Sequence, residues 1–360
     1  MSLILKAHAE DLFSEELHEL QKQDKEQRPP NWNLSPQAVV SYLMGCKLKN
    51  GLEIKPKYIG SKRLMEIAVA TLATDRSLLL YGVPGTAKSW VSEHISAAIC
   101  GSSILLVQGT AGTSEDAIRY SWNYAMLLAK GPSREALVPS PVMKAMEQGK
   151  IARIEELTRM PSDVQDALIT ILSEKTLPVT ELSAEVQASK GFNIIATANN
   201  KDRGVNEISS ALKRRFNTVI LPVPSSLEEE MKIVENRVKS LGHSLELPST
   251  APALDEIKKV VTIFRELRAG VTLDGKMKIK QPSGTMSVAE AISVMSNGWA
   301  LSAHFGNGKL KSQDIAASIL GAVVKDPVQD TLIWKEYLET VVKNREGWQD
   351  LYSSCRELVE

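Results

Sequence analysis

The chain has 360 residues, of which 43% are hydrophobic and 24% charged, so it can bury a large core and is long enough for two domains. Its 43 basic and 43 acidic residues give a formal net charge of zero. This balance excludes a strong overall attraction to nucleic acid or to an anionic membrane surface.

The cysteines and the first residues of the chain indicate the compartment. The three cysteines are far apart, in no spacing typical of a disulfide framework or a zinc site: Cys46, Cys100 and Cys355. The five histidines have no metal-binding spacing either. The start of the chain has no basic region before its short apolar run, and no later apolar run is long enough to span a membrane. We therefore expect a soluble, cytoplasmic protein that is not exported.

The N-terminal part of the chain is predicted to be helical. Residues 1–30 are rich in charge and end in a break at Pro29 and Pro30. Ser35 followed by Pro36 is typical of a helix start, because a capping side chain there precedes a proline in the first turn. A polar loop and an amphipathic helix follow. The apolar face of that helix is predicted to include Leu64, Ile67, Ala68, Thr71 and Leu72.

Residues 78–89, LLLYGVPGTAKS, join an apolar run to a glycine-rich turn that ends in Lys-Ser. They follow the pattern G-x-x-x-x-G-K-[ST], in which backbone N–H groups surround phosphate oxygens, the lysine reaches the β and γ phosphates, and the hydroxyl binds Mg²⁺. Gly82 opens this loop, Lys88 supplies the positive charge and Ser89 is the metal ligand. A strand before the loop and a helix over 89–99 are the context that the motif requires. The alternative is a glycine turn in an unrelated βα unit.

Ala87 stands where this motif usually has its second glycine. A methyl group is tolerated there if the residue has helical dihedral angles, because glycine is required only where φ is positive or two backbones come close. The match to a phosphate-binding loop is therefore predicted to depend on helical dihedral angles at Ala87.

Apolar runs after the loop predict further buried parallel strands, which with the strand at 78–80 make five. These runs are 104–107, 151–154, 193–197 and 218–221. Helices are predicted between the strands, which indicates a parallel sheet covered on both faces. The connection over 108–149 is long and irregular, and such excursions are usually functional. Residues 177–191 predict a hairpin.

Polar residues directly follow two of these strands. Glu155 and Glu156 come after the strand at 151–154, and Asn199 follows the strand at 193–197. Open α/β sheets bind ligands outside the carboxyl ends of their strands, so this placement favours a functional acidic pair over a solvated one.

Helix ends account for some of the other polar residues. Ser162 and Gln165 have the spacing of a capping box, which predicts that Ser162 caps a helix. The apolar face of that helix is predicted to be Val164, Ala167, Leu168, Ile171 and Leu172. Arg214 and Arg215 end a short predicted helix, where basic residues can simply complement the helix dipole. Arg153, inside a predicted core strand, has no explanation at this level.

Pro222 and Pro224 mark a boundary, beyond which the chain is predicted to be helical. The predicted helices are 226–241, 253–268, 287–303, 312–324 and 330–358.

The motifs GVPGTAKS, IEELTRMP, GFNIIATANN and ALKRRF, in this order, resemble those of the MoxR family of AAA+ ATPases. The similarity is to the branch with an insert within helix 2 and a hairpin before sensor 1, and it covers roughly residues 56–328. It implies an α/β fold, a P-loop NTPase AAA+ core with a five-stranded parallel sheet over 35–224. An all-α lid domain would follow over 225–328, with helical extensions over 1–34 and 329–360.

The resemblance implies a role for each matching residue. The adenine pocket would be lined by Tyr58, Ile59 and Gly60, and the phosphate loop by Gly82, Val83, Pro84, Gly85, Thr86, Ala87, Lys88, Ser89 and Trp90. Mg²⁺ would be held by Ser89 and Glu155. Glu156 would polarise the attacking water, Asn199 would orient it as sensor 1, and Arg215 would be the arginine finger offered to the next subunit. Thr158 falls where the family has an Asn that can hold the glutamate inactive, and Arg159 matches the neighbouring arginine.

Two positions depart from the family pattern. Glu155 replaces the usual aspartate, and its extra methylene is expected to move the carboxylate outward and weaken the water-mediated hold on Mg²⁺. The lid helix begins SGTMSVAEA, without the usual sensor 2 arginine. Lys88 and Arg215 would then remain to neutralise the phosphates.

The resemblance implies a Mg²⁺-dependent ATPase that acts at subunit interfaces of a homo-oligomeric ring, expected to be a hexamer. Such rings remodel or activate a partner protein, often one with a von Willebrand factor A domain. A nucleotide-controlled assembly scaffold with little turnover is an alternative, favoured by Glu155 and the missing sensor 2 arginine. A DNA motor is a second alternative, which the neutral charge disfavours. No membrane partner is expected.

Overall fold

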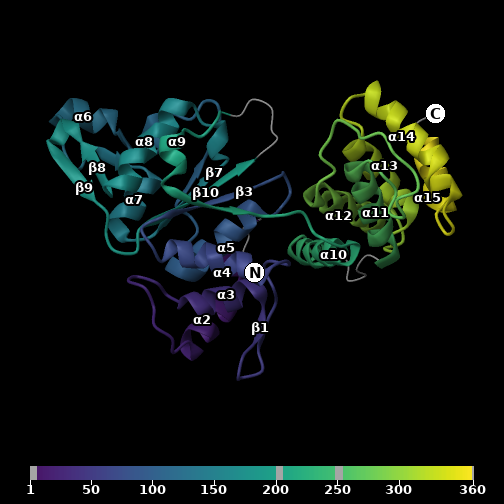
Figure 1. Cartoon of the computed structure of the whole chain (residues 1–360), viewed down its shortest axis with the longest axis horizontal. Coiled ribbons are helices and arrows are strands. Elements are labelled where there is room, and N and C mark those ends of the chain that lie inside the picture. The colour runs from purple at the N-terminus through teal and green to yellow at the C-terminus, as the bar shows by residue number, and fades with distance from the viewer. Residues whose placement is uncertain (1–5, 200–205, 248–253, 359–360) are drawn as a thin grey trace. The chain divides into compact units, whose positions relative to one another are not determined.

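A computed structural model of the chain describes residues 6–199, 206–247 and 254–358, and Figure 1 follows its elements along the chain. The described residues group into two compact units, one formed mainly by residues 6–222 and the other from Val223 onward. Each unit is described by itself. No helix among the described residues is long and apolar enough to cross a membrane.

The first unit is built on a five-stranded parallel sheet with the strand order β11–β3–β10–β7–β4. Its strands are β3 (Ser77–Gly82), β4 (Leu106–Gln108), β7 (Ile151–Glu155), β10 (Asn193–Asn199) and β11 (Phe216–Ile220). The register pairs Asn199 with Gly82, and Gln108 with Glu155. The carboxyl ends of these strands therefore lie together on one side of the sheet, which we call the carboxyl edge. The predicted α/β fold with five parallel strands is therefore confirmed.

Helices cover both faces of this sheet, which explains why its inner strands are buried along almost their whole length. One apolar cluster lies under α3 (Pro36–Met44), α4 (Lys62–Leu72) and α5 (Lys88–Cys100). The cluster on the other face lies under α7 (Pro141–Gln148), α8 (Ser162–Ser173) and the short α9 (Ser210–Lys213). The two layers of helices hold the central strands in place, and with them the residues at the strand ends.

The outermost strand, β4, differs from its prediction. The apolar run at 104–107 was expected to be a buried strand, but β4 begins only at Leu106. Ile104 is 57% exposed and Leu106 38% exposed. The reason is position, because β4 is an edge strand that pairs with β7 alone. An apolar run does not distinguish an edge strand from a central one.

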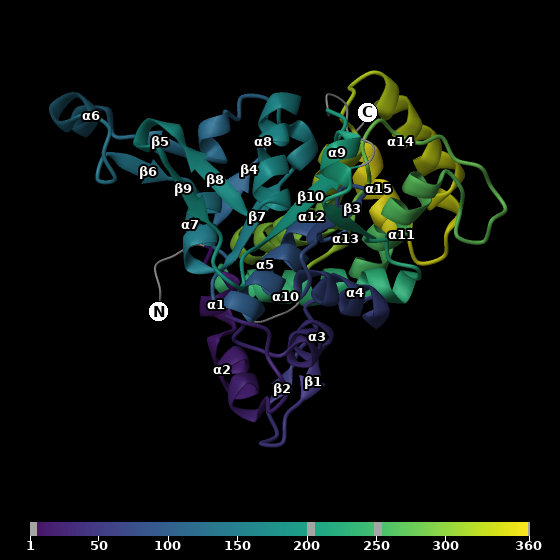
Figure 2. The same cartoon turned by 60° about the vertical axis from the view of Figure 1, so that its left-hand side comes forward.

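Two antiparallel hairpins interrupt the α/β alternation. The long connection forms β5 (Tyr120–Trp122) and β6 (Leu137–Pro139), and α6 (Tyr124–Lys130) lies at the tip of this hairpin. Figure 2 shows α6 projecting away from the sheet, and none of its residues is buried. The second pair, β8 (Thr176–Val179) and β9 (Ala184–Gln187), confirms the hairpin predicted within 177–191.

The N-terminal helices α1 (Ala9–Leu12) and α2 (Ser14–Gln23) belong to the first unit. Leu20 of α2 packs into the apolar cluster under α3 to α5, and the backbone N–H of Ala9 donates to Glu93 of α5 (3.1 Å). The predicted helix start at Ser35 is confirmed, since its hydroxyl accepts from the N–H of Ala38 (3.2 Å). A small ladder of β1 (Cys46–Lys47) and β2 (Glu53–Ile54) follows α3.

Two helix details were predicted wrongly. Ser162 is not a cap but the first residue of α8, because Pro161 occupies the N-cap position. The Gln165 amide instead donates to the backbone oxygen of Met160 (3.0 Å). In α4 the predicted apolar face is confirmed at Ala68, Thr71 and Leu72, but the buried face is rotated from Leu64 and Ile67, and Ile67 is 37% exposed. The fully buried residues of this helix include Met65, Ala68 and Val69.

The second unit is a helical domain with one apolar core. Its helices are α10 (Leu227–Ser244), α11 (Leu254–Ala269), α12 (Val288–Phe305), α13 (Ser312–Val323), α14 (Gln329–Thr340) and α15 (Gln349–Glu357). The single helix predicted over 330–358 is wrong, because a short 3₁₀ turn at Val342–Asn344 and Gly347, with φ of 75°, separate α14 from α15. Residue 253, the predicted start of one helix, lies outside the described residues.

Asp330 in α14 stabilises the segment that precedes this helix. It is completely buried and accepts hydrogen bonds from the backbone N–H groups of Lys325 (2.9 Å), Asp326 (2.9 Å) and Ser283 (2.8 Å). The Ser283 hydroxyl donates a fourth hydrogen bond (2.6 Å). Burial by itself would raise the pKa of Asp330, but these donors together lower it to about 2.

We expect Asp330→Asn to lower the free energy of unfolding at pH 7 by about 2 kcal/mol, because an amide is a weaker acceptor and turns an N–H toward the same donors. The pKa of Asp330 is lower in the folded chain than in the unfolded one. Its contribution to the free energy of unfolding is therefore complete above about pH 4 and is lost as pH falls toward about 2. The stability difference between wild type and variant should therefore shrink on acidification. Thermal unfolding of both proteins from neutral pH downward measures it, and a constant difference would contradict the assignment.

Candidate functional site

The phosphate-binding loop connects β3 to α5 at the carboxyl edge of the sheet. Gly85 and Ala87 have positive φ values of 81° and 62°, which turn the backbone sharply before the helix begins. Lys88 is only 6% exposed, and its ammonium donates to the backbone oxygens of Gly82 (3.1 Å) and Val83 (2.9 Å). Successive N–H groups in such a turn form an anion-binding concavity, so the loop suits phosphate.

The prediction that the loop depends on helical dihedral angles at Ala87 is wrong, because the loop forms without them. Its φ of 62° and ψ of 22° are left-handed, not helical, and it is the N-cap residue of α5. An L-residue other than glycine pays about 1–2 kcal/mol for this conformation. The methyl group is exposed to solvent, so no steric conflict with neighbouring atoms adds to that cost.

We expect Ala87→Gly to raise the free energy of unfolding by about 0.5–1 kcal/mol, because relief of the left-handed strain exceeds the added entropy of the unfolded chain. Urea unfolding measures the change. Ala70→Gly is the matched control, since Ala70 is also exposed but lies inside α4. That variant should lose about 1 kcal/mol. Equal losses in both variants would contradict the strain at Ala87.

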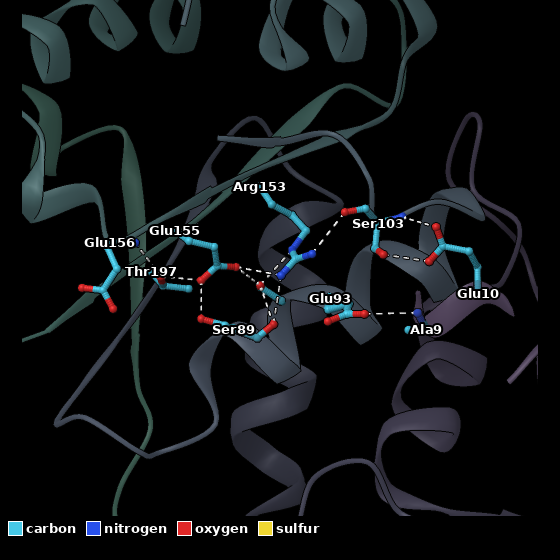
Figure 3. Close-up of polar contacts among 10 residues, drawn as sticks. Ala9, Glu10, Ser89, Glu93, Ser103, Arg153, Glu155, Glu156 and Thr197 are labelled. Carbon is cyan, nitrogen blue, oxygen red and sulfur yellow. Dashed lines mark hydrogen bonds and ion pairs between the residues drawn. The ribbon is translucent and has the colours of Figure 1, made fainter. Parts of the chain in front are cut away.

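Glu155, the last residue of β7, is buried, and each of its carboxylate oxygens accepts two hydrogen bonds (Figure 3). Oε2 accepts from the hydroxyls of Ser89 (2.5 Å) and Thr197 (2.7 Å). Oε1 accepts from the Ser92 hydroxyl and from Nη2 of Arg153 (2.9 Å). The longer side chain thus lies against Ser89 and Ser92 of α5, and its extra methylene does not separate the carboxylate from Ser89.

Ser89 and Glu155 form a donor set that fits Mg²⁺. A hydroxyl oxygen and a carboxylate oxygen meet at the start of α5, and hard oxygen ligands are those that this ion prefers. In the described part of the chain, no group of three or more His, Cys, Asp or Glu side chains forms a metal site of its own. Mg²⁺ usually takes one or two protein oxygens together with substrate phosphates, so these residues suit an ion that arrives with a nucleotide.

Glu156 lies beside this pair in a left-handed conformation, with φ of 57°. Nδ2 of Asn199 donates to both of its carboxylate oxygens, Oε1 at 3.1 Å and Oε2 at 2.9 Å. Nε of Arg159 lies 3.4 Å from Oε2. Thr158, where the resemblance implied a restraint on this glutamate, has a buried hydroxyl without a hydrogen-bond partner in the structure. In this structure Asn199 holds Glu156, and Thr158 does not.

The residues expected around the adenine lie next to the phosphate-loop helix. Tyr58 is buried, Ile59 partly exposed, and Gly60 has a φ of 150°. The indole N–H of Trp90, in the first turn of α5, donates to the backbone oxygen of Lys57 (2.7 Å). This bond ties the start of α5 to the segment that carries Tyr58.

Lys57 also links this segment to the N-terminal helices. Its ammonium donates to Oε2 of Glu16 in α2 (2.6 Å) and lies 3.9 Å from the centre of the Phe13 ring. Burial lowers the pKa of Lys57, and the Glu16 carboxylate opposes that shift. Residues of the N-terminal helices therefore contact the segment that carries Tyr58, through Lys57.

Arg215 is separate from the residues above. It precedes β11, whose first residue, Phe216, pairs with Ser77 at the amino edge of the sheet. Its Nε donates to the hydroxyl of Ser173 (2.8 Å) and its Nη1 to the backbone oxygen of Ala211 (2.6 Å). Within one chain, Arg215 and the phosphate loop lie at opposite edges of the sheet.

Three residues of the site were not predicted from the sequence. Arg153, Ser92 and Thr197 all contact Glu155. Each of them had one weak signal in the sequence. Arg153 lies inside an apolar strand, Ser92 lies one helical turn after Ser89, and Thr197 lies two residues before Asn199. Neither signal identifies a partner by itself.

Known families match both units. Residues 77–216 match the family model described as AAA domain (dynein-related subfamily). Residues 228–359 match the YehL-like AAA+ ATPase C-terminal domain.

Individual relatives agree with these matches. The uncharacterized protein YehL of Escherichia coli (strain K12) is 39% identical over 357 residues, which are 96% of each chain. Midasin of Dictyostelium discoideum is 31% identical over 109 residues, 29% of this chain and 2% of that protein. The solved structure of NtrX from Brucella abortus in complex with ADP has a TM-score of 0.51 and 15% identity, and covers 78% of this chain and 62% of that one, which shows the fold alone. The chain belongs to the YehL-like family of AAA+ ATPases.

Proposed function

We propose that this ATPase hydrolyses Mg²⁺-bound ATP at the interfaces between subunits of a ring, expected to be a hexamer, and uses the cycle to remodel or activate a partner protein. The observation that carries the proposal is the division of the site. Lys88, Ser89, Glu155 and Glu156 gather at the carboxyl edge of the sheet, whereas Arg215 lies at the amino edge. A neighbouring subunit would be needed to bring an arginine to the phosphates.

The described residues supply distinct parts of the reaction. The loop and Lys88 would bind the phosphates. Ser89 and Glu155 would hold the metal, which would neutralise phosphate charge when bound. Glu156 would accept the proton of the attacking water. It must first leave Asn199, whose amide N–H group now bridges its two oxygens. Asn199 would then be free to orient the water.

We infer that this ATPase falls within the MoxR branch that the motifs resemble. The insertion of β5, α6 and β6 between β4 and β7, and the β8–β9 hairpin directly before β10, support this assignment. A partner with a von Willebrand factor A domain rests on that resemblance alone.

A nucleotide-controlled scaffold with little turnover is the second candidate. It is favoured by the hydrogen bonds of both acidic side chains. Glu155 accepts from four donor groups, and Glu156 accepts from Asn199. A site held this way could bind nucleotide firmly and turn over slowly.

Mass in solution with and without ATP, combined with the steady-state rate of phosphate release, tests the proposal. The proposed function predicts ATP-dependent assembly into a ring and turnover that DNA does not stimulate. Lys88→Ala is the control, because it removes the cation of the loop and should abolish both. Assembly without turnover would favour the scaffold, stimulation by DNA would favour a motor, and a monomer active with ATP would contradict the ring.

A further inference from the structure

Arg153 is a charged residue inside the central sheet, and catalysis as described above does not use it. It lies in β7 with 5% of its surface exposed. A buried guanidinium is unfavourable unless its N–H groups are paired. Nε donates to the Ser92 hydroxyl (3.1 Å) and Nη1 to the backbone oxygen of Ser103 (3.1 Å). Nη2 donates to the backbone oxygen of Ser89 (3.1 Å) and to Oε1 of Glu155 (2.9 Å).

Arg153 and Glu155 reach the same helix because side chains two residues apart in a strand point to the same side of the sheet. That side is covered by α5, where Ser89 and Ser92 lie one turn apart. The guanidinium and Ser92 occupy Oε1 of Glu155, and Oε2 is thereby directed to Ser89. Arg153 thus fixes the orientation of the carboxylate, with one oxygen at the metal position.

A glutamate needs such a partner more than an aspartate does, because its additional torsion gives the carboxylate more conformations. Without the guanidinium, Oε1 would keep the Ser92 hydroxyl alone, and a buried carboxylate would lose its cation. A carboxylate in that situation turns toward water. That rotation moves the anionic oxygen away from Ser89.

The segment that holds Arg153 is itself held by the N-terminal helix α1. The backbone N–H and the hydroxyl of Ser103 donate to the two carboxylate oxygens of Glu10, each at 2.8 Å. Figure 3 shows the continuous set of contacts from Glu10 through Ser103 and Arg153 to Glu155. The start of the chain is therefore connected to the metal position by paired polar groups throughout.

We infer that Arg153 is a positioning residue of the ATPase site. It fixes Glu155 in the conformation that directs Oε2 to Ser89, and α1 supports it through Ser103. The inference rests on the proposed function in one respect, that Ser89 and Glu155 hold nucleotide-bound Mg²⁺. Arg153 itself acts through Glu155 and not on the nucleotide.

The affinity for ADP of the full chain, measured in excess Mg²⁺ and in EDTA, tests this role without turnover. The ratio of the two affinities is the Mg²⁺ preference. Arg153→Gln should lower the Mg²⁺ preference by about 10- to 100-fold and leave the affinity in EDTA nearly unchanged. Arg153→Lys should restore part of it, because an ammonium keeps the charge but cannot bridge the same partners.

Arg345→Gln is the matched control for lost stability. Arg345 pairs with the fully buried Glu266 in the second unit, so this variant removes a buried ion pair elsewhere. It should lower the unfolding temperature and leave the Mg²⁺ preference unchanged. Glu10→Ala tests the support from α1 and should lower the preference by about two- to fivefold.

Each outcome has one meaning. An unchanged Mg²⁺ preference in Arg153→Gln would overturn the inference, and so would an increase, which would show that the guanidinium competes with the ion. An unchanged preference in Glu10→Ala would overturn the support through Ser103. A wild-type protein that binds ADP equally well in EDTA would instead contradict the metal role of Ser89 and Glu155, and with it the proposed function.

Discussion

Replacing Glu156 with glutamine is expected to lower the rate of ATP hydrolysis by about 10²- to 10⁴-fold and to leave ATP affinity within about twofold. The amide has the shape of the carboxylate and still accepts a hydrogen bond from Asn199, but it cannot take a proton from water. Steady-state phosphate release and equilibrium binding of ATP measure the two quantities separately.

Glu155→Gln is the contrasting variant, because the two acidic residues are adjacent and have different partners. It removes the charge beside Ser89 and Arg153, so it should weaken Mg²⁺-dependent binding as well as turnover. If Glu156→Gln stayed active and only Glu155→Gln lost turnover with intact binding, the roles of the two carboxylates would be reversed.

Arg215→Ala is expected to lower turnover by about 10³- to 10⁵-fold, the usual effect of removing an arginine finger. ATP affinity should hardly change, because Arg215 lies at the edge of the sheet opposite to the loop of its own chain. The guanidinium would act only on the γ-phosphate of the next subunit, where it stabilises charge on the transferred group.

Mixing inactive variants tests whether the arginine acts in trans. Arg215→Ala subunits keep an intact pocket, and Lys88→Ala subunits keep an intact finger. Mixed rings should regain part of the activity wherever the two meet. If every mixture stays inactive despite co-assembly confirmed by mass, Arg215 acts in its own chain or is structural, and Arg214 or Arg159 becomes the leading candidate.

Residues that depend on local spacing and strand order could be predicted from the sequence. The loop motif alone located Lys88 and Ser89. Glu155, Glu156 and Asn199 follow two different strands, and a parallel sheet necessarily brings such strand ends to one edge. The structure places them as expected, with Asn199 in contact with Glu156.

Features that depend on distant partners could not be predicted. The partners of Arg153 come from α5, from Ser103 and from its own strand, and no local pattern connects these segments. The dihedral angles of Ala87 were predicted wrongly for another reason. The path from β3 into α5 demands a left-handed residue there, and an alanine by itself argues against one. The exposure of β4 depends on its edge position, which is a property of the whole sheet.

The contact between Asn199 and Glu156 implies two populations of molecules, one with the Glu156 carboxylate bound to Asn199 and one with it free to act as the proposed base. A hydrogen bond to a charged group contributes about 1.5–3 kcal/mol. At the lower value, about 7% of the molecules would have a free carboxylate at any moment, and at the upper value fewer than about 1%. A bound γ-phosphate or a neighbouring subunit that gave the Asn199 amide another acceptor could therefore raise the observed rate by about one to two orders of magnitude. The rate constant of bond cleavage itself would not change.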